Sequence, residues 1–235
     1  MKIYLTDPTQ LQTAEKECAP FWERALRLVE DERRVRILST GASLRRGTLL
    51  AGGLLLQYGV AEAAETAGAS GIPEEGEREF RFLEIPEVVD RLEALGHVRQ
   101  YSLNFGPWGK PCFAEEGKTM PFFNLSHSGR YLALALSRRE VGIDLQETAR
   151  KADFKALADR FFTPAERSKL GESPDPEAFY RLWVRKEAYG KCTGEGLAGA
   201  LPMNLTDEGL RLLAGFAITE PLAPEGYRLC VCERT

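Results

Sequence analysis

The pattern of apolar and polar positions predicts a chain of mixed α and β structure. The segment KIYLT near the amino end alternates like a strand, and two helical stretches are expected after it, at about 11–38 and 44–66. The apolar run at 131–136 and the segment REVGIDLQ predict two further strands. The residues between them, 137–140, fit either a hairpin or a crossing from one half of the molecule to the other. We place a boundary between two halves near residue 140.

The carboxy-terminal part predicts two helices and then strands. Thr163 and Pro164 are typical of a helix start, and a second helix is expected at about 177–192. The runs LRLLAGFAI and GYRLCVC are typical of strands bounded by Gly and Pro. Loops are expected at 67–79 and 107–111, and SHSG at 126–129 is expected to form a turn.

Composition and charge exclude several classes of protein. The 235 residues are 43% hydrophobic and 28% charged, which is typical of a folded globular chain. A formal net charge of -4 argues against general nucleic-acid binding. We find no signal peptide and no stretch apolar enough to span a membrane, so we expect a cytoplasmic protein that does not bind membranes. Five cysteines without a CxxC pair, together with only two histidines, favour reduced thiols over a disulfide scaffold or a zinc site.

Two short segments carry carboxylates in patterns that could serve chemistry. Asp144 and Gln146 are two positions apart, so a strand projects both from one face, where both could reach one hard cation. The alternative is an Asp exposed at a strand end. Glu187 and Lys191 are four apart on one helix face, a spacing that also describes an ordinary stabilising ion pair.

Other segments suggest contacts to a phosphate. The SHSG segment offers hydroxyls, an imidazole and a glycine that could surround a phosphate oxygen. An arginine cluster that includes Arg33 and Arg46 could bind an anion, or could form a solvated helix face. The GEGLAG match to a dinucleotide-binding motif follows a predicted helix rather than a strand, so we reject it, and no P-loop motif is present.

Taken in order, five segments resemble the 4'-phosphopantetheinyl transferases of the surfactin-synthetase-activating type: GKPCF, FNLSHSG, VGIDLQ, RFFTPAE and FYRLWVRKEAYGKCTGEGL. The resemblance covers about half of the chain, from Gly109 to roughly Leu201. It implies an α/β (α+β) fold built as a pseudo-dimer of two similar subdomains, 1–140 and 141–235, with the active site in the cleft between them. It also implies a monomer, since such a chain builds its cleft internally.

The implied activity is transfer of the 4'-phosphopantetheine group from coenzyme A to a serine of an apo acyl or peptidyl carrier protein, with release of 3',5'-ADP. By this resemblance Asp144 and Glu187 ligate Mg²⁺, and the amide oxygen of Gln146 or a water takes a third position. Glu187 is also the base, directly or through a metal-bound water, and Lys191 steadies phosphate charge. Such a reaction needs a divalent cation, a base and cationic groups at the phosphates. The alternative is a homologue that binds coenzyme A or a carrier protein without catalysis.

The resemblance further implies contacts to coenzyme A from two segments and two arginines. Gly109, Lys110 and Pro111 match the contact on the nucleotide side, and Ser126 and His127 match the phosphate-contacting segment. Arg33 and Arg46 are the residues expected at the 3'-phosphate. This sequence departs from the family at Gln146, where an acid is frequent; we expect weaker metal binding from this change rather than loss of activity.

Overall fold

The computed structural model describes residues 1–66, 78–115, 120–149 and 152–235. The part before residue 140 contains β1 (Lys2–Thr6), α1 (Thr9–Glu17), α2 (Ala19–Arg27), α3 (Asp31–Ser39), α4 (Ser43–Thr66), β2 (Glu79–Phe82), α5 (Ile85–Ala94), β3 (Leu103–Phe105), β4 (Pro111–Phe113), β5 (Phe122–Ser128) and β6 (Tyr131–Ser137). The remainder contains β7 (Val141–Glu147), α6 (Phe154–Phe161), α7 (Pro164–Leu170), α8 (Pro176–Thr193), α9 (Gly196–Ala200), α10 (Asp207–Leu210), β8 (Phe216–Thr219) and β9 (Tyr227–Arg234). The mixed α and β fold class is confirmed.

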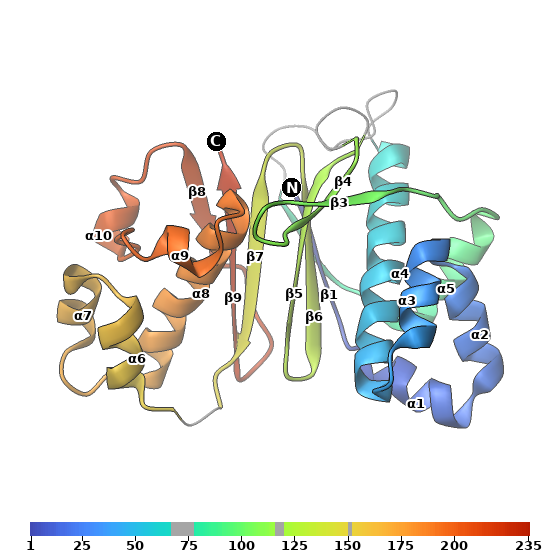
Figure 1. The fold of residues 1–235 in the computed structure, drawn as a ribbon, viewed down its shortest axis with the longest axis horizontal. Helices are drawn as coiled ribbons and strands as arrows, with labels where there is room; N and C mark the ends of the chain where they lie inside the picture. The colour runs from blue at the N-terminus through green and yellow to red at the C-terminus, as the bar shows by residue number, and fades with distance from the viewer. Residues whose placement is uncertain (67–77, 116–119, 150–151) are drawn as a thin grey trace.

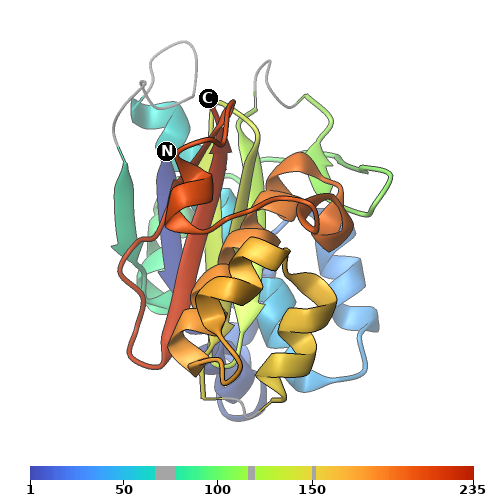
Figure 2. The same ribbon diagram turned by 90° about the vertical axis from the view of Figure 1, so that its left-hand side faces the viewer.

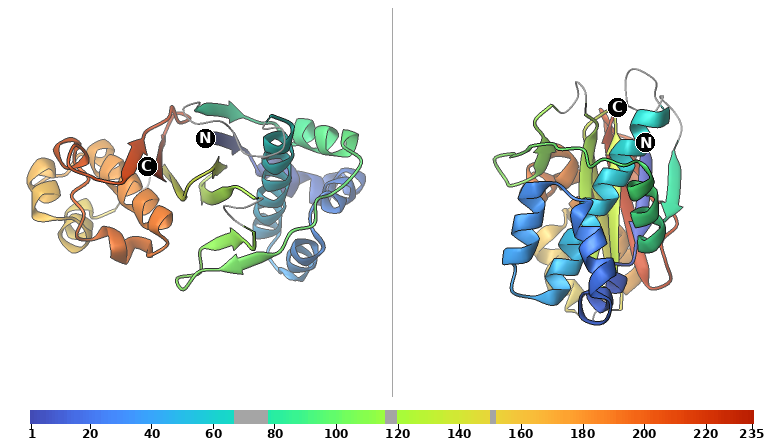
Figure 3. Two further views of the ribbon diagram at one scale, coloured as in Figure 1. Left: turned by 90° about the horizontal axis from the view of Figure 1, so that it is seen from above. Right: turned by 90° about the vertical axis from the view of Figure 1, so that its right-hand side faces the viewer.

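Two sheets lie side by side in the middle of the molecule, with helices α1–α5 on one side and α6–α10 on the other (Figure 1). One sheet has the strand order β2-β1-β6-β5 and the other β7-β9-β8, while β3 and β4 form a separate hairpin. Views from either end show α6–α8 in front of one sheet and α1–α5 in front of the other (Figures 2 and 3). Strand β6 pairs with β1 and β5, whereas β7 pairs with β9, so residues 137–140 carry the chain from one sheet to the other. Of the two predictions for this segment, the crossing is correct.

Alternation along the strands divides their side chains between separate cores. Val141, Ile143 and Leu145 of β7 point into an apolar core between the two sheets. The intervening residues of β7 therefore face α8, because successive side chains of a strand point to opposite faces. Strand β6 is apolar on both faces: its leucines pack toward α4 and its alanines toward the other sheet. Asp144 is thus directed away from the core between the sheets.

Strands β5 and β7 are joined by side chains of β5 that accept hydrogen bonds from backbone groups of β7. Asn124 Oδ1 accepts from the Ile143 N–H at 2.9 Å, Ser126 Oγ from Leu145 N–H at 3.1 Å, and Ser128 Oγ from Glu147 N–H at 3.0 Å. We call this row the β5–β7 seam. It explains why a buried strand carries polar residues at every second position, because each of them satisfies one N–H of its neighbour.

Three sequence predictions for local structure need correction. The first helical stretch is three helices: α1 ends at Glu17, because the next residue, Cys18, has a φ of -141° that is not helical, and Pro20 lies in the first turn of α2. The SHSG segment is not a turn: β5 runs through Ser128, and only Gly129, with φ +53°, and Arg130 form the turn. The LRLL part of the first predicted carboxy-terminal strand is not a strand: Leu210 ends the short helix α10, and residues 211–213 lie between α10 and β8.

The other local predictions agree with the structure where it describes them. Thr163 caps α7 in a capping box, with Pro164 at the first helical position. The predicted turn at 107–111 connects β3 to β4. Most of the predicted loop at 67–79 lies outside the described residues, and Glu79 begins β2. All five cysteines are free thiols, as expected.

Candidate active site

Asp144 is a buried carboxylate near the middle of β7. Asp144 is 1% exposed, so the alternative of an Asp in water at a strand end is wrong. Gln146 donates from Nε2 to Asp144 Oδ2 at 3.1 Å, which confirms that the two residues share one face. Ser126 of β5 donates from Oγ to Asp144 Oδ1 at 3.0 Å. A buried carboxylate is costly unless it is paired, and here neighbouring polar groups surround both of its oxygens.

A glycine on β7 allows α8 to approach this carboxylate. A Cβ atom built at Gly142 would lie 2.1 Å from the Ala188 carbonyl oxygen and 2.3 Å from the Cys192 nitrogen. Only a residue without a side chain permits backbone to pack this closely on backbone. The contact fixes the height of α8 above β7, and it brings the helix face that carries Glu187 and Lys191 over Asp144.

Lys191 is the cation of this cluster. Its Nζ lies 2.7 Å from Asp144 Oδ1, 3.0 Å from Ser126 Oγ and 3.1 Å from the carbonyl oxygen of Ile143. The ammonium group thus bonds to residues of β5 and β7 from its position on α8. An ordinary stabilising ion pair with Glu187 within one helix is therefore not sufficient to explain Lys191.

Glu187 lies one turn before Lys191 and is half-buried. Burial raises the pKa of the Glu187 carboxyl, the negative charge of Asp144 raises it further, and Lys191 opposes both. Two carboxylates in one partly buried place repel each other, and the repulsion favours the protonated form of one of them. A carboxylate whose pKa is raised is a stronger base, so Glu187 is suited to accept a proton.

A second buried charge pair anchors α8 on its other side. Lys186 and Glu166 are both fully buried, with Nζ 3.0 Å from Oε2. Lys186 also donates to the carbonyl oxygens of Ala200 and Met203, and Glu166 Oε1 accepts from the Leu205 N–H. These bonds tie α8 to α7 and to the segment around α9. Lys186 and Glu187 are adjacent in the sequence, but Lys186 bonds on this side of α8, whereas Glu187 lies on the side of Asp144.

Lys110 connects the β3–β4 hairpin to the carboxy-terminal elements. Its Nζ donates to the carbonyl oxygens of Val141 and Cys192, both at 3.1 Å. Gly109 is exposed and has φ +80°, a conformation that favours glycine, and Pro111 begins β4. His127 of β5 is exposed and is the neighbour of Ser126 in the sequence. Of the predicted contact residues, Ser126 and Lys110 thus bond directly to the strand or helix of the cluster.

The two predicted arginines are engaged among the amino-terminal helices. Arg33 Nε lies 2.6 Å from Glu30 Oε1, and Arg46 Nε lies 2.5 Å from Glu15 Oε1. Arg46 also donates to the carbonyl oxygens of Thr40 and Gly41. Neither arginine bonds to the Asp144 cluster, which draws its members from β5, β7 and α8.

The sequence interpretation assigned no role to Gly142 or to the Lys186–Glu166 pair. An isolated glycine in an apolar strand signals a close backbone approach, and that signal was present in VGIDLQ. No sequence pattern predicts the buried pair of Lys186 and Glu166, because the two residues lie 20 positions apart in different helices. Within the described ranges, no group of three or more His, Cys, Asp or Glu side chains is arranged to hold a metal ion. In the same ranges no helix is both long and apolar enough to cross a membrane.

Comparison with known proteins supports the resemblance. Residues 140–227 match the family model described as the 4'-phosphopantetheinyl transferase superfamily. A putative 4'-phosphopantetheinyl transferase of Synechocystis is 41% identical over 128 residues, which are 52% of this chain and 51% of that protein. The 4'-phosphopantetheinyl transferase HetI of Nostoc is 40% identical over 107 residues, 42% of this chain and 44% of its own. The 4'-phosphopantetheinyl transferase Sfp of Bacillus subtilis is 36% identical over 149 residues, 56% of this chain and 63% of its own.

The chain thus spans about half the length of the curated relatives it matches. The matched segment of the family model contains Asp144, Gln146, Glu187 and Lys191, all of the candidate residues that β7 and α8 contribute. The resemblance seen in the sequence is thus confirmed over residues 140–227, which match the model of the 4'-phosphopantetheinyl transferase superfamily.

Proposed function

We propose that this protein transfers the 4'-phosphopantetheine group of coenzyme A to a serine of an apo acyl or peptidyl carrier protein and releases 3',5'-ADP. The observation that carries the proposal is the convergence of Asp144, Glu187 and Lys191, from a strand and a helix far apart in sequence, within the segment that matches the transferase superfamily. Relatives named 4'-phosphopantetheinyl transferases support it.

The donor set fits a magnesium ion. Mg²⁺ is held by oxygen ligands, commonly by one or two carboxylates with substrate phosphates and waters. Asp144 and Glu187 would supply the carboxylates, and Gln146 would supply an amide oxygen or leave its position to water. A divalent cation would also relieve the repulsion that raises the pKa of Glu187. When bound, the metal would neutralise the diphosphate charge of coenzyme A.

The residues of the cluster then have separate tasks in the reaction. The serine oxygen of the carrier forms a bond to the phosphorus next to the pantetheine arm, and the bond from that phosphorus to the bridging oxygen breaks. The electron pair leaves with 3',5'-ADP, and Glu187 accepts the serine proton. Lys191, already held between Asp144 and Ser126, places a positive charge where phosphate charge develops.

Coenzyme A is proposed to contact both parts of the chain, 1–140 and 141–235. Lys110 with Gly109 and Pro111 would meet its nucleotide, and Ser126 with His127 its phosphates. Arg33 and Arg46 would have to exchange their present partners, Glu30 and Glu15, to reach the 3'-phosphate. The pseudo-dimer of two similar halves, with the coenzyme between them, remains part of this proposal.

The test is the intact mass of apo carrier proteins from fatty-acid, polyketide and peptide synthesis after incubation with the protein, coenzyme A and Mg²⁺. We expect at least one carrier to gain the mass of the arm, and we expect chelation of the metal to prevent it. Asp144→Ala and Glu187→Ala should abolish transfer with an unchanged circular dichroism spectrum. The control is Glu177→Ala, on the same helix α8, where the carboxylate makes an exposed ion pair with Arg228.

Two results would contradict the proposal. Full turnover by Asp144→Ala or Glu187→Ala would remove the cluster from the reaction. No transfer to any carrier, together with saturable binding of coenzyme A in calorimetry, would favour the alternative of a non-catalytic binding homologue.

A further inference from the structure

Strand β7 forms one edge of its sheet, and this edge lies against β5. An edge strand leaves the N–H and C=O groups of every second residue without a partner in its own sheet. The β5–β7 seam supplies acceptors for three of these N–H groups, and two lysines supply donors for carbonyl groups. Lys110 donates to the Val141 carbonyl at 3.1 Å. Lys191 donates to the Ile143 carbonyl, also at 3.1 Å. Side chains rather than a neighbouring strand therefore fix this edge of β7.

Ile143 is held at both of its backbone groups. Asn124 accepts a hydrogen bond from its N–H, and Lys191 donates one to its C=O. An ammonium group has three protons to donate. Three acceptors lie within 3.1 Å of Lys191 Nζ, namely Asp144 Oδ1, Ser126 Oγ and this carbonyl oxygen. The position of the ammonium group therefore depends on where the backbone of Ile143 stands relative to β5.

The three side chains of the seam differ in length. Asn124 carries its acceptor oxygen one bond farther from the backbone than Ser126 and Ser128 do. The distances from the acceptor oxygen to the nitrogen of β7 are nevertheless alike, at 2.9, 3.1 and 3.0 Å. The longer side chain thus allows β7 to stand farther from β5 at Ile143 than at the serines, by up to about 1.2 Å, the length of a C=O bond. The seam is widest at the residue whose carbonyl Lys191 reaches.

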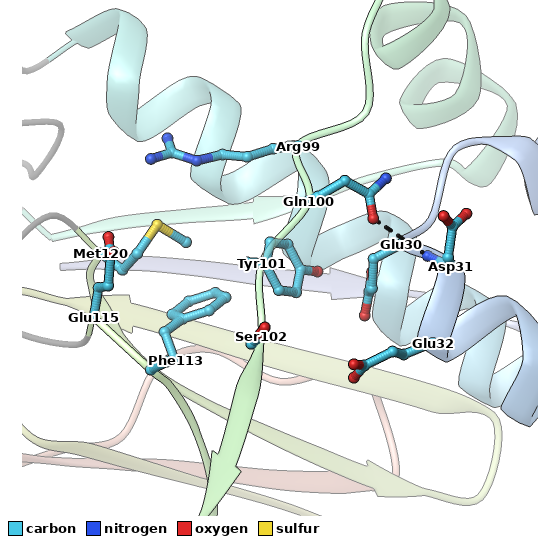
Figure 4. Close-up of a pocket in the computed structure, with 11 residues that line it drawn as sticks. Glu30, Asp31, Glu32, Arg99, Gln100, Tyr101, Ser102, Phe113, Glu115 and Met120 are labelled. Carbon is cyan, nitrogen blue, oxygen red and sulfur yellow. Dashed lines mark hydrogen bonds between the residues drawn. The ribbon is translucent and has the colours of Figure 1, made fainter.

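The strands on both sides of this gap are anchored. Phe123, the neighbour of Asn124, points to the opposite face of β5 and is fully buried against Phe113, with ring centroids 4.7 Å apart. Phe113 in turn packs edge-to-face on Tyr101, with centroids 4.8 Å apart (Figure 4). On the other side, β7 is held by the contact of Gly142 with the backbone of α8. Because both strands are fixed, the length of Asn124 controls the gap between them.

We infer that Asn124 is a positioning residue of the proposed active site, an inference that rests on the transferase function proposed above. Asn124 acts as a spacer that keeps the Ile143 carbonyl where Lys191 bonds to it and to Asp144 at the same time. A shorter side chain with an acceptor draws β7 toward β5 and displaces the ammonium group from the phosphate that it serves. Asn124 is only 5% exposed, so it acts through Lys191 rather than by touching a substrate.

The test compares Asn124→Ser with Asn124→Ala. Serine restores an acceptor for the Ile143 N–H but not the length, whereas alanine restores neither. Asn124→Ser should therefore melt at a higher temperature than Asn124→Ala, yet both should lower kcat of the transfer at least tenfold. The KM for coenzyme A should change by less than about twofold, because the charge of Lys191 acts where phosphate charge develops during the reaction.

The position of Lys191 is also measured without any substrate. The protein is acetylated with the N-hydroxysuccinimide ester of acetic acid, and the modified lysines are mapped by mass spectrometry of peptides, with the exposed Lys16 of α1 as the internal reference. In the unsubstituted protein three acceptors hold the ammonium group, so acetylation of Lys191 should be slow. Asn124→Ser should increase its rate several-fold and leave that of Lys16 unchanged.

The matched control is Thr206→Ala. Thr206 is buried, and its Oγ1 accepts the Gly209 N–H at 3.1 Å, so this variant also loses one buried acceptor for a backbone N–H, but at α10 rather than at β7. It should lower the melting temperature and leave both kcat and the acetylation of Lys191 unchanged.

Three results separate the possible failures. Unchanged acetylation of Lys191 in Asn124→Ser overturns the inference, whatever the activity. Recovery of kcat together with stability in Asn124→Ser also overturns it, because Asn124 would then have a structural role alone. If the unsubstituted protein transfers nothing, the proposed function fails, and acetylation alone decides whether Asn124 positions Lys191. If Asn124→Ala fails to fold, Asn124→Ser against the unsubstituted protein decides the outcome.

Discussion

Replacement of Gly142 by Ala is expected to impair the proposed transfer reaction more than it impairs folding. The new Cβ would lie 2.1 Å from the Ala188 carbonyl oxygen, where ordinary contact begins at 3.4 Å. The nearest atoms all belong to the backbone of α8, so no side-chain rotation relieves the clash. The helix must move by about 1 Å, a displacement that can cost on the order of 100-fold in rate when it misplaces catalytic groups.

The expected cost in stability is modest by comparison. Overpacking of this kind raises the free energy of the folded state by about 1–3 kcal/mol. For a chain of this size each kcal/mol lowers the melting temperature by roughly 2–4 °C. The fold should therefore survive, because α8 is also held by the Lys186–Glu166 pair and by contacts to β9.

The assay is the initial rate of phosphopantetheine transfer, followed by intact mass, next to thermal unfolding by circular dichroism. The matched control is Gly41→Ala, since a Cβ at Gly41 meets no atom within 4 Å and should leave both quantities unchanged. A Gly142→Ala variant with the rate of the unsubstituted protein would refute the reasoning, because it would show that the height of α8 above β7 does not control the reaction.

Two further predictions concern ion pairs that hold α8, one of them fully buried and the other between buried Arg185 and exposed Asp207. Lys186→Met should lower the free energy of unfolding in urea by about 3–5 kcal/mol, since it leaves Glu166 buried and unpaired. The double variant with Glu166→Leu should recover part of that loss, and a double variant less stable than the single one would contradict the explanation. The hydrogen bond from Arg185 lowers the pKa of the Asp207 carboxyl from its ordinary value of 3.8. The pair therefore stabilises the folded state above pH 3.8, and this contribution is lost as the pH falls through the lowered pKa. The free energy of unfolding of Arg185→Gln should therefore fall less between pH 5 and about pH 2 than that of the unsubstituted protein, as measured by urea titration. Identical pH dependence of the two proteins would exclude this pair as a cause of the acid sensitivity.

The sequence was sufficient for the parts of the site that lie within one element. Strand periodicity placed Asp144 and Gln146 on one face of β7, and helix periodicity placed Glu187 and Lys191 on one face of α8. That these two faces meet depends on the Gly142 contact and on pairing between distant strands, which no local pattern encodes. The meeting was inferred only through the resemblance to the transferases.

One failure has an equally specific cause. The polar residues of SHSG indicated a turn, yet Ser126 and Ser128 are polar because they bond to β7. That Arg33 and Arg46 hold the 3'-phosphate stays a prediction: the structure pairs Arg33 with Glu30, three residues before it, and Arg46 with the more distant Glu15. The arginine of a local helix pair and the arginine of an anion site have the same appearance in a sequence.

The β5–β7 seam has a consequence for how such a protein can vary. In a backbone ladder every residue type except proline supplies the same bonds, so substitutions leave the spacing of two strands nearly unchanged. At the seam each bond belongs to one particular side chain, and a longer or shorter residue at Asn124 or Ser128 alters the separation of the two sheets locally. Because Ser126 in the middle of the row also bonds to Asp144 and Lys191, such substitutions can adjust the geometry of the proposed active site without replacing any charged residue.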